Sequence, residues 1–325
     1  MTVAAGSRKL KVGLMLPQTE GVRGPGVRGW SQVSEMATLG EDIGLDSLWL
    51  VDHLMYQLQG EEEPRGVWEV WSLLSALAVT TQRVELGTLV LAMGWRNPAL
   101  LAKMADTVEE ISQGRLILGV GSGYHKREFD AYGFPFGYKV SRFEEAIQIL
   151  CGLLREGAVD FEGTYHQARE CELRPRGPRA NGPPILIGTN AGSTRMQRLT
   201  ARYADIFNVY YDNTHNRVEG FKNVLPEILE ACRYEGREPT SLEKTVTVLL
   251  ADSTADPWWD RLPTNSYAGE GPLIPLTGQP ADIAEELNQY RIAGASHVQI
   301  CLEPTNCQTI EALAPVLEAL DEISV

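Results

Sequence analysis

Short apolar runs alternate with amphipathic stretches along the whole chain. The runs are rich in Val, Ile and Leu, which is typical of buried strands, whereas the stretches between them carry apolar residues at helical intervals of three and four. Eight such pairs follow one another. The predicted strands cover residues 11–16, 47–51, 84–91, 116–120, 185–187, 206–209, 245–250 and 297–302.

Several of the amphipathic stretches have typical helix ends. Asn97 followed by Pro98 is a favoured helix start, and Ser31 or Ser34 can cap the first helix. Pro226 is expected to kink or divide the sixth helix. The predicted helices cover residues 31–43, 67–80, 98 to about 111, 142–154, 193–204, 216–235, 281–293 and 309–323.

Eight strand–helix units in succession, without a change of composition, predict an α/β fold: a single (β/α)8 TIM barrel over residues 1–325. Inserts are expected after the fourth and seventh strands and between the fourth helix and the fifth strand, where a small hairpin is predicted around residues 161–167. These inserts explain a length above the roughly 250 residues typical of the fold. A doubly wound sheet would need fewer units or a second domain.

The chain is acidic, with a formal net charge of −14. Its 43% of hydrophobic residues can form a large core, which excludes global disorder. The negative charge disfavours broad contact with nucleic acid or anionic membranes. Five cysteines without a C-x-x-C pair indicate neither a disulfide framework nor a zinc site. Because neither a signal peptide nor a transmembrane run of about 18 residues is evident, we expect a cytoplasmic protein.

Active sites of (β/α)8 barrels lie where the carboxyl ends of the strands meet the following loops. His53 lies just after the second predicted strand and is the candidate for proton transfer, with Asp52 as its orienting group or as a cap. A lone histidine more often has a structural role, so its position is what favours catalysis. Polar and aromatic residues in the same loops are candidates for the wall of an apolar substrate pocket: Gln18, Trp95, Trp258 and Trp259.

Two glycine-rich turns follow predicted strands. The turn after the fourth strand has Gly119 and Gly121 but carries Tyr124 at the place of the third glycine of a dinucleotide fingerprint, so a Rossmann site is not indicated. Its cationic end, residues 125–127, suits a charged cofactor tail or substrate, although a solvated loop is the commoner fate of such a run. The turn at residues 188–193 precedes a helix and suits a phosphate group; a simple capped turn is the alternative.

Other chemistries have weaker support in the sequence. The five histidines lack the paired spacings of strong metal motifs, so no metal site is predicted. No G-x-S-x-G elbow is present. Asp52, Asp252 and Glu303 lie just after the ends of predicted strands, which leaves a glycosidase with paired carboxylates open.

Several long runs resemble the bacterial luciferase-like flavin and deazaflavin oxidoreductases. They are GLDSLWLVDHL, VELGTLVL, NPALLAKMADTVEEISQGRLILGVGSGYHKREFDAYGFPF, RFEEAIQIL, PPILIGTNAGSTRMQRLTARYADIFN and TGQPADIAEELNQYRIAGASHVQI. The resemblance covers nearly the whole chain. It implies a (β/α)8 barrel, commonly dimeric, that binds either FMN or the deazaflavin coenzyme F420 at its mouth.

The resemblance also implies roles for particular residues. His53 would lie near the reactive ring, and Thr88 and Leu89 would stand at a bulge with a non-prolyl cis peptide behind that ring. The two glycine turns would line the cofactor, the second of them taking its phosphate, through Gly121, Ser122, Gly123, Tyr124, His125, Gly188, Thr189, Asn190 and Gly192.

These observations predict an F420-dependent oxidoreductase that moves a hydride between the deazaflavin and an apolar or aromatic small molecule. The F420 branch is favoured by the motifs VDHL, NPALLAKM and GVGSGYHKREFDAYG. Glucose 6-phosphate is not the expected substrate, since Tyr124 and Gln57 stand where sugar-phosphate dehydrogenases of that branch carry Glu and Trp. An FMNH2-dependent monooxygenase is the first alternative, and a non-enzymatic flavin-binding scaffold is the second. The loop around Trp258 and Trp259 is a candidate lid.

Overall fold

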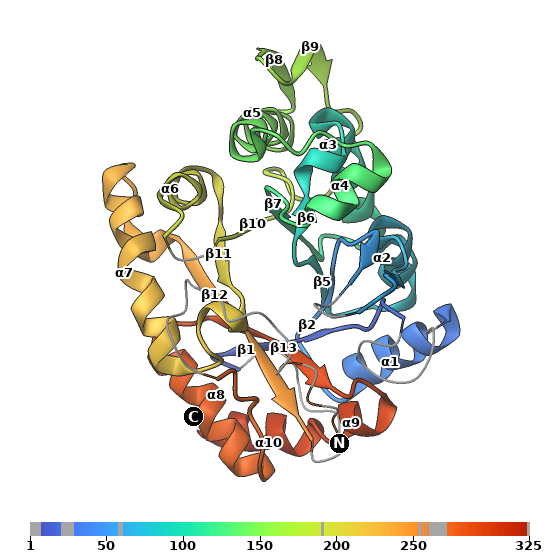
Figure 1. Cartoon of the computed structure of the whole chain (residues 1–325), viewed down its shortest axis with the longest axis vertical. Helices are drawn as coiled ribbons and strands as arrows, with labels where there is room; N and C mark the ends of the chain where they lie inside the picture. The colour runs from blue at the N-terminus through green and yellow to red at the C-terminus, as the bar shows by residue number, and fades with distance from the viewer. Residues whose placement is uncertain are drawn as a thin grey trace.

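Eight parallel strands close into a barrel in the computed structural model, which describes residues 8–20, 29–57, 61–189, 192–252, 255, 257, 259 and 272–323. Each strand pairs with the next along the chain, β13 pairs with β1, and the pairing of β7 with β10 completes the ring (Figure 1). The strands are β1 (Lys11–Met15), β2 (Ser47–Leu50), β5 (Glu85–Thr88), β7 (Leu116–Gly121), β10 (Ile185–Gly188), β11 (Ile206–Val209), β12 (Glu243–Ala251) and β13 (His297–Glu303). The predicted (β/α)8 barrel is therefore confirmed.

A helix follows each strand and lies on the outside of the barrel (Figure 1). The eight helices of the repeat are α1 (Trp30–Asp42), α2 (Val70–Thr80), α3 (Pro98–Ile111), α5 (Lys139–Cys151), α6 (Thr194–Tyr203), α7 (Val218–Tyr234), α8 (Pro280–Ile292) and α10 (Ala314–Ile323). A short α9 (Cys307–Glu311) precedes the last of them. Within the described residues, no helix combines the length and the hydropathy needed to cross a bilayer.

The sixth helix of the repeat, α7, runs unbroken through Pro226, so the expected division at this residue is wrong. Proline removes one backbone hydrogen bond from the helix interior. Val224 and Ile228, on either side of it, are both buried in the core. This packing stabilises the helix across the missing bond.

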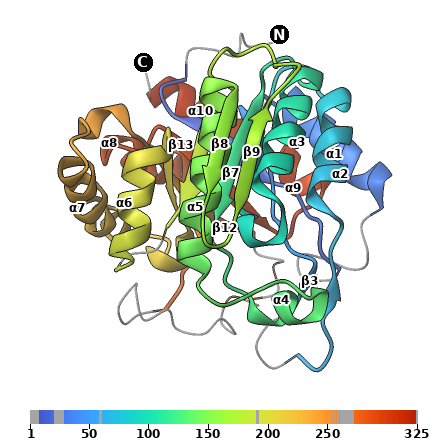
Figure 2. The same cartoon turned by 90° about the horizontal axis from the view of Figure 1, so that it is seen from above.

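The inserts contain elements of their own. The predicted hairpin is present as β8 (Ala158–Glu162) and β9 (Gln167–Glu172), which extends away from the barrel at the top of Figure 1. The insert after β7 forms a short helix, α4 (Lys126–Tyr132), and a small ribbon of β3 (Met55–Tyr56) and β4 (Arg65–Gly66) lies beside it at one end of the barrel (Figure 2). The sequence pattern predicted neither α4 nor this ribbon. The insert after β12 lies largely outside the described residues.

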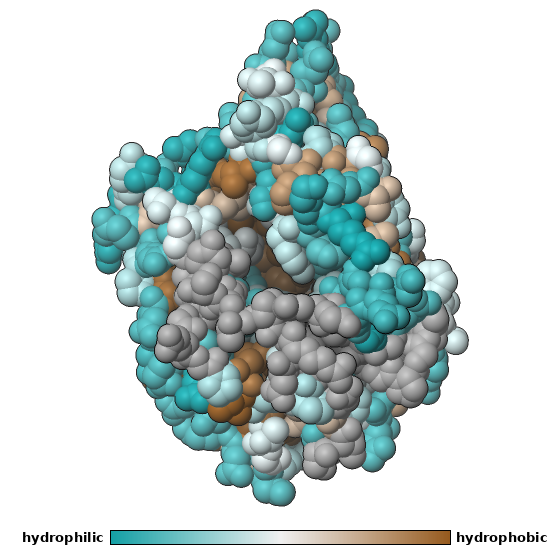
Figure 3. Space-filling view, viewed as in Figure 1, coloured by the Kyte–Doolittle hydropathy of each residue, from teal (hydrophilic) through white to brown (hydrophobic). Residues whose placement is uncertain are grey.

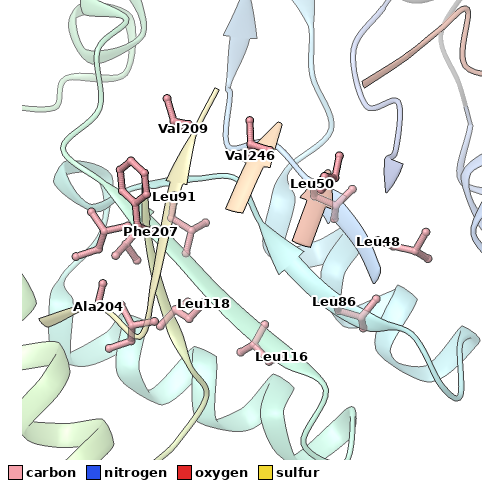
Figure 4. Close-up of a cluster of buried hydrophobic side chains, with 14 of the residues drawn as sticks. Leu48, Leu50, Leu86, Leu91, Leu116, Leu118, Ala204, Phe207, Val209 and Val246 are labelled. Carbon is pink, nitrogen blue, oxygen red and sulfur yellow. The ribbon is translucent and has the colours of Figure 1, made fainter. Parts of the chain in front are cut away.

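The main core fills the space between the barrel and its helices. Side chains of successive strands point outward into it, among them Leu48 on β2, Leu86 on β5 and Phe207 on β11 (Figure 4). All three are nearly or wholly buried. This layer fixes the strands in place and leaves their carboxyl ends and loops available for a site.

Inside the barrel, the indole of Trp49 on β2 fills the space between neighbouring strands. Gly13 on β1 and Gly87 on β5 face it, and a Cβ at either position would overlap the ring. The indole Nε1 donates to Ser47 Oγ at 2.6 Å, and this oxygen lies 2.7 Å from Nε2 of His297 on β13. The barrel interior is therefore a packed core beneath the mouth rather than a channel.

His297 should make the stability of the protein depend on pH. Burial, with a smaller contribution from the charge of Lys11, lowers the pKa of His297 from 6.5 to about 3. Because the folded state then binds fewer protons than the unfolded state, the contribution of His297 to stability is present above pH 6.5 and is lost as the pH falls toward 3. Replacing His297→Gln should flatten the fall of the unfolding free energy in this window by up to about 1.4 kcal/mol per pH unit.

Urea unfolding of both proteins at several pH values measures this slope directly. Equal slopes for the wild type and the variant would show that His297 does not titrate differently on folding.

Candidate active site

His53 follows β2 at the end of the barrel where the strands meet their loops. Its Nδ1 lies 2.9 Å from Glu128 Oε2, and its Nε2 lies 3.3 Å from the hydroxyl oxygen of Tyr124. Glu128 belongs to α4 and Tyr124 to the glycine-rich turn after β7. The fold therefore brings the ends of two strands and the short inserted helix together around one imidazole.

Glu128 is a site residue that the sequence hypothesis missed. Its carboxylate is fully buried: Oε1 accepts from the amides of Leu54 at 2.6 Å and Met55 at 3.2 Å, and Oε2 is shared by Nδ1 of His53 and Nδ1 of His125. Burial alone would raise the pKa of Glu128, but the hydrogen bonds and charge of His53 and the two amides outweigh it and lower the pKa. The carboxylate is thus ionised near neutral pH.

A spacing in the sequence could have pointed to Glu128. His125 and Glu128 are three residues apart, which places them on one face of a helix, but the sequence pattern did not predict a helix there. The contact with His53 joins residues 75 positions apart and leaves no local signal.

Potential metal-ligand atoms of His53, His125 and Glu128 lie within 4.8 Å of one another, although histidine spacing had predicted no metal site. Both Nδ1 atoms reach the same carboxylate oxygen, at 2.9 and 3.0 Å. These are hydrogen-bond distances. We therefore describe the group as a hydrogen-bonded cluster of two imidazoles on one carboxylate.

Tyr124 directs its hydroxyl toward His53, although the residue as a whole is 67% exposed. Burial of the hydroxyl, followed by the charges of Tyr56, Glu128 and Asp212, raises the pKa of Tyr124. The phenol therefore stays protonated at neutral pH and can donate its hydrogen bond to Nε2 of His53. The ring of Tyr56 packs edge-on against the imidazole, with centroids 5.0 Å apart.

Asp52 has a different set of partners from the one expected. Its carboxylate forms a bidentate ion pair with Arg96, at 2.6 and 2.9 Å, and accepts from the amide of Ala92 at 2.8 Å. The Asp52 side chain is 1% exposed. The group that orients His53 is therefore Glu128 rather than Asp52, and Asp52 connects β6 (Leu91–Ala92) to Arg96.

The third predicted strand is interrupted at the mouth. β5 ends at Thr88, the peptide between Leu89 and Val90 is cis, and pairing resumes in β6, so a non-prolyl cis peptide stands where the resemblance implied one. Thr88 is buried, and its hydroxyl donates to the carbonyl of Gly119 at 2.8 Å and accepts from its amide at 3.0 Å. A Cβ at Gly119 would overlap the Thr88 carbonyl oxygen, so this close approach requires glycine.

An apolar cluster lies within the barrel beneath the loops, and we call it the mouth floor. Figure 3 shows a hollow on this face with hydrophobic residues visible in its depth. The buried members of the floor include Leu89, and Val90, Tyr56, Tyr210 and Trp259 pack against it. The full set of buried members is Met15, Trp49, Leu89, Ile117, Leu186, Ile206, Tyr211, Leu249 and Cys301.

The residues predicted to line a substrate pocket have different positions. Trp259 packs against the mouth floor, and Trp258 lies outside the described residues. Gln18 is buried, and its amide bonds with the backbone of Val51 and Trp68. Trp95 is 8% exposed and packs with Phe129 and Phe134.

The remaining residues of the first turn lie around Tyr124. Gly121 ends β7, and a Cβ at this position would overlap the side chain of Val90. Ser122 follows it. Gly123 has a φ of +76°, and a Cβ there would overlap the ring of Phe129. His125 directs its Nδ1 to Glu128 rather than outward. In the cationic run of this loop, the imidazole of His125 therefore faces Glu128, whereas Lys126 is exposed and pairs with Asp130.

The second glycine turn precedes α6, which begins at Thr194 without a side-chain cap from Ser193. Gly188 ends β10, Thr189 is buried, and Asn190 lies outside the described residues. The amide of Gly192 donates to Glu227 Oε2 at 2.9 Å, and Glu227 comes from α7. The carboxylate of Glu227 therefore accepts the hydrogen bond of one of the amides that were expected to bind a phosphate.

Comparison with known proteins shows the family to which the chain belongs. Residues 10–268 match the model of a family described as luciferase-like monooxygenase. The chain belongs to this luciferase-like family. It is 32% identical over 225 residues to an F420-dependent glucose-6-phosphate dehydrogenase of Amycolatopsis mediterranei, a match that covers 67% of this chain and 64% of the relative. The matched part is thus slightly less than two thirds of that dehydrogenase.

Other relatives of this luciferase-like chain differ in activity. A pyrimidine monooxygenase, RutA of Allorhizobium ampelinum, is 27% identical over 209 residues, covering 62% of this chain and 55% of the relative. The solved structure of an F420-dependent secondary alcohol dehydrogenase with an F420-acetone adduct has a TM-score of 0.79 at 18% identity, covering 96% of this chain and 99% of that one. At that identity the structural likeness supports the fold alone. Dehydrogenases and monooxygenases are both oxidoreductases, so the family relation supports an oxidoreductase.

The ion pair of Asp52 in this luciferase-like barrel should contribute strongly to stability. Replacing Asp52→Asn leaves the guanidinium of Arg96, which is 12% exposed, without its buried counter-charge. Loss of one partner of a buried pair costs about 3–5 kcal/mol, so we expect the unfolding free energy in urea to fall by about this amount.

The matched control is Asp130→Asn, which removes the exposed ion pair with Lys126. This pair should contribute less than about 1 kcal/mol. Equal losses for the two variants would show that Asp52 does not anchor the loop.

Proposed function

We propose that this chain is an F420-dependent oxidoreductase that moves a hydride between the deazaflavin and an apolar or aromatic small molecule. The observation that carries the proposal is the imidazole of His53, held by Glu128 at the mouth of the barrel beside the mouth floor. A proton donor or acceptor next to an apolar hollow suits a hydride transfer that also needs a proton. The F420-dependent relatives support the choice of cofactor.

The residues of the mouth fit such a cofactor. The mouth floor, with Leu89 and Val90 at the cis peptide, offers an apolar surface for a planar ring. Gly121, Ser122 and Gly123 of the first turn would line the cofactor together with Tyr124. In the second turn, Gly188, Thr189, Asn190 and Gly192 would take its phosphate, because the amino end of α6 favours an anion.

When bound, F420 supplies the hydride chemistry. The chain supplies the surroundings: the apolar floor excludes water, Trp259 walls the hollow, and His53 exchanges the proton. Tyr124 and Gln57 stand where sugar-phosphate dehydrogenases carry Glu and Trp, so we propose an apolar substrate rather than glucose 6-phosphate.

An FMNH2-dependent monooxygenase is the second candidate, and the similarity to the pyrimidine monooxygenase favours it. A deazaflavin carries carbon at the reactive nitrogen position of the ring and reacts poorly with oxygen, so the two cofactors imply different chemistry. Titration of the apoprotein with F420 and with FMN separates the two proposals. Binding of either cofactor without turnover under any reductant would favour a non-enzymatic scaffold.

We also propose that the protein forms a homodimer, as the family resemblance implies, and that it works in the cytoplasm, as expected from the sequence. The proposal includes no nucleic-acid or membrane partner, because the net charge of −14 disfavours polyanionic surfaces.

Removal of the imidazole tests the role of His53. His53→Ala should lower turnover by about 10²- to 10⁴-fold, the range typical of general acid–base catalysis, while the Kd for F420 changes little. The measurement is the rate of F420 reduction or oxidation with the substrate that the wild type turns over fastest among a panel of apolar alcohols and ketones.

The control for this test is His166→Ala, which alters a histidine next to β9 of the hairpin. Its turnover should equal that of the wild type. Unchanged turnover in His53→Ala would exclude His53 from the proton transfer.

A substitution of Glu227 tests whether the second glycine turn binds the cofactor phosphate. If the turn holds the cofactor phosphate, the carboxylate on the Gly192 amide opposes binding by like charge and by competition. Glu227→Gln should therefore tighten F420 binding by about three- to ten-fold, which corresponds to about 1 kcal/mol. Fluorescence titration of the apoprotein with F420 measures the change.

The neighbouring Glu230, exposed on the same helix and paired with Arg233, provides the matched control. Glu230→Gln should leave the Kd unchanged. Equal affinities for the wild type and Glu227→Gln would indicate that the phosphate binds elsewhere.

A further inference from the structure

We infer that Glu128 is the positioning residue that fixes the tautomer of His53, so that Nδ1 carries the hydrogen and Nε2 is the nitrogen that exchanges a proton at the barrel mouth. The assignment of the tautomer rests on the hydrogen bonds of the cluster. Only its consequence for the reaction rests on the proposed function.

The hydrogen bonds of Glu128 are compatible with only one tautomer of a neutral His53. An ionised carboxylate has no hydrogen to donate, so it can only accept. Oε1 already accepts from the amides of Leu54 and Met55, and Oε2 faces Nδ1 of His53 at 2.9 Å. In a neutral imidazole with Nδ1 protonated, Nε2 holds a lone pair.

The contact at Nε2, the other nitrogen of the ring, agrees with this tautomer. Tyr124 places its hydroxyl 3.3 Å from Nε2 and can donate its hydrogen to the lone pair. The path from Tyr124 through His53 to Glu128 then has one donor and one acceptor at each contact. With the other tautomer, Nδ1 and the Oε2 atom of Glu128 would both be acceptors and would repel one another.

The position of Glu128 also fixes the plane of the ring. Its two backbone contacts are to the residues directly after His53, so the carboxylate holds the strand end and the side chain together. His125 binds the same oxygen from the start of α4 and orients the carboxylate from the other side. A third group that orients a histidine is what makes the imidazole a base of defined geometry.

The isosteric substitution Glu128→Gln reverses the pattern. The two amides of Leu54 and Met55 need an acceptor, so the carbonyl of the new side chain must face them. Its NH2 group then faces the two Nδ1 atoms and can only donate. We expect His53 in this variant to carry its hydrogen on Nε2, with Nδ1 as the acceptor.

Nitrogen-15 NMR of the apoprotein, recorded at a basic pH where the histidine nitrogen shifts no longer change with pH, shows the tautomer directly. His53→Asn identifies the signals of His53 among the five histidines. The matched control is Glu109→Gln, which replaces another fully buried glutamate, bound to Arg179 and to the amide of Leu116. This control should lower stability but leave the tautomer of His53 unchanged.

Hydrogen on Nδ1 in the wild type and on Nε2 in Glu128→Gln supports the inference. Hydrogen on Nε2 in the wild type, or the same tautomer in both proteins, overturns it. The wild-type spectrum alone can overturn the inference, so the inference remains testable even if the Glu128→Gln variant does not fold.

Turnover separates this inference from the proposed function. A wrong tautomer behind a catalytic histidine can cost about 10⁴-fold in turnover, so we expect a loss of about 10²- to 10⁴-fold in Glu128→Gln. A reversed tautomer with unchanged turnover would leave the role of Glu128 intact and would contradict His53 as the proton-exchanging group.

Discussion

The buried carboxylate of Glu128 is the constraint on which the mouth of the barrel depends. A carboxylate without solvent is costly unless its oxygens accept several hydrogen bonds. Here the backbone after β2 and two imidazoles supply four of them. The short helix α4 is thereby attached to the end of β2, and the position of the imidazole follows from it.

The barrel could be predicted from the sequence because its signals are local. Apolar runs, helical spacing and the Asn97-Pro98 start each lie within a few residues, and eight repetitions leave one architecture that fits. The expectations that proved wrong also have a physical explanation. Pro226 was expected to kink or divide a helix, and the division does not occur because tertiary packing of its neighbours keeps the helix continuous.

The candidate site was predictable only in part. His53 and Tyr124 lie at the carboxyl ends of strands, where the fold alone directs attention. Glu128 was missed because its role depends on a contact with a residue 75 positions away. Of the two roles considered for Asp52, orienting His53 or capping the next segment, the first is filled by Glu128. Gln18 and Trp95 were assigned to a pocket by position, whereas their side chains bind backbone or pack in an aromatic cluster.

The contact between Glu227 and the Gly192 amide gives the protein an internal anion beside its predicted phosphate turn. Because Glu227 belongs to the same chain, it competes with any other anion for the Gly192 amide at a fixed effective concentration. This concentration is in the millimolar range for short tethers and does not depend on the protein concentration. A phosphate that bound at this turn would therefore have to displace a resident carboxylate from the Gly192 amide. Such a displacement would cost part of the binding free energy that the turn could offer to any anion.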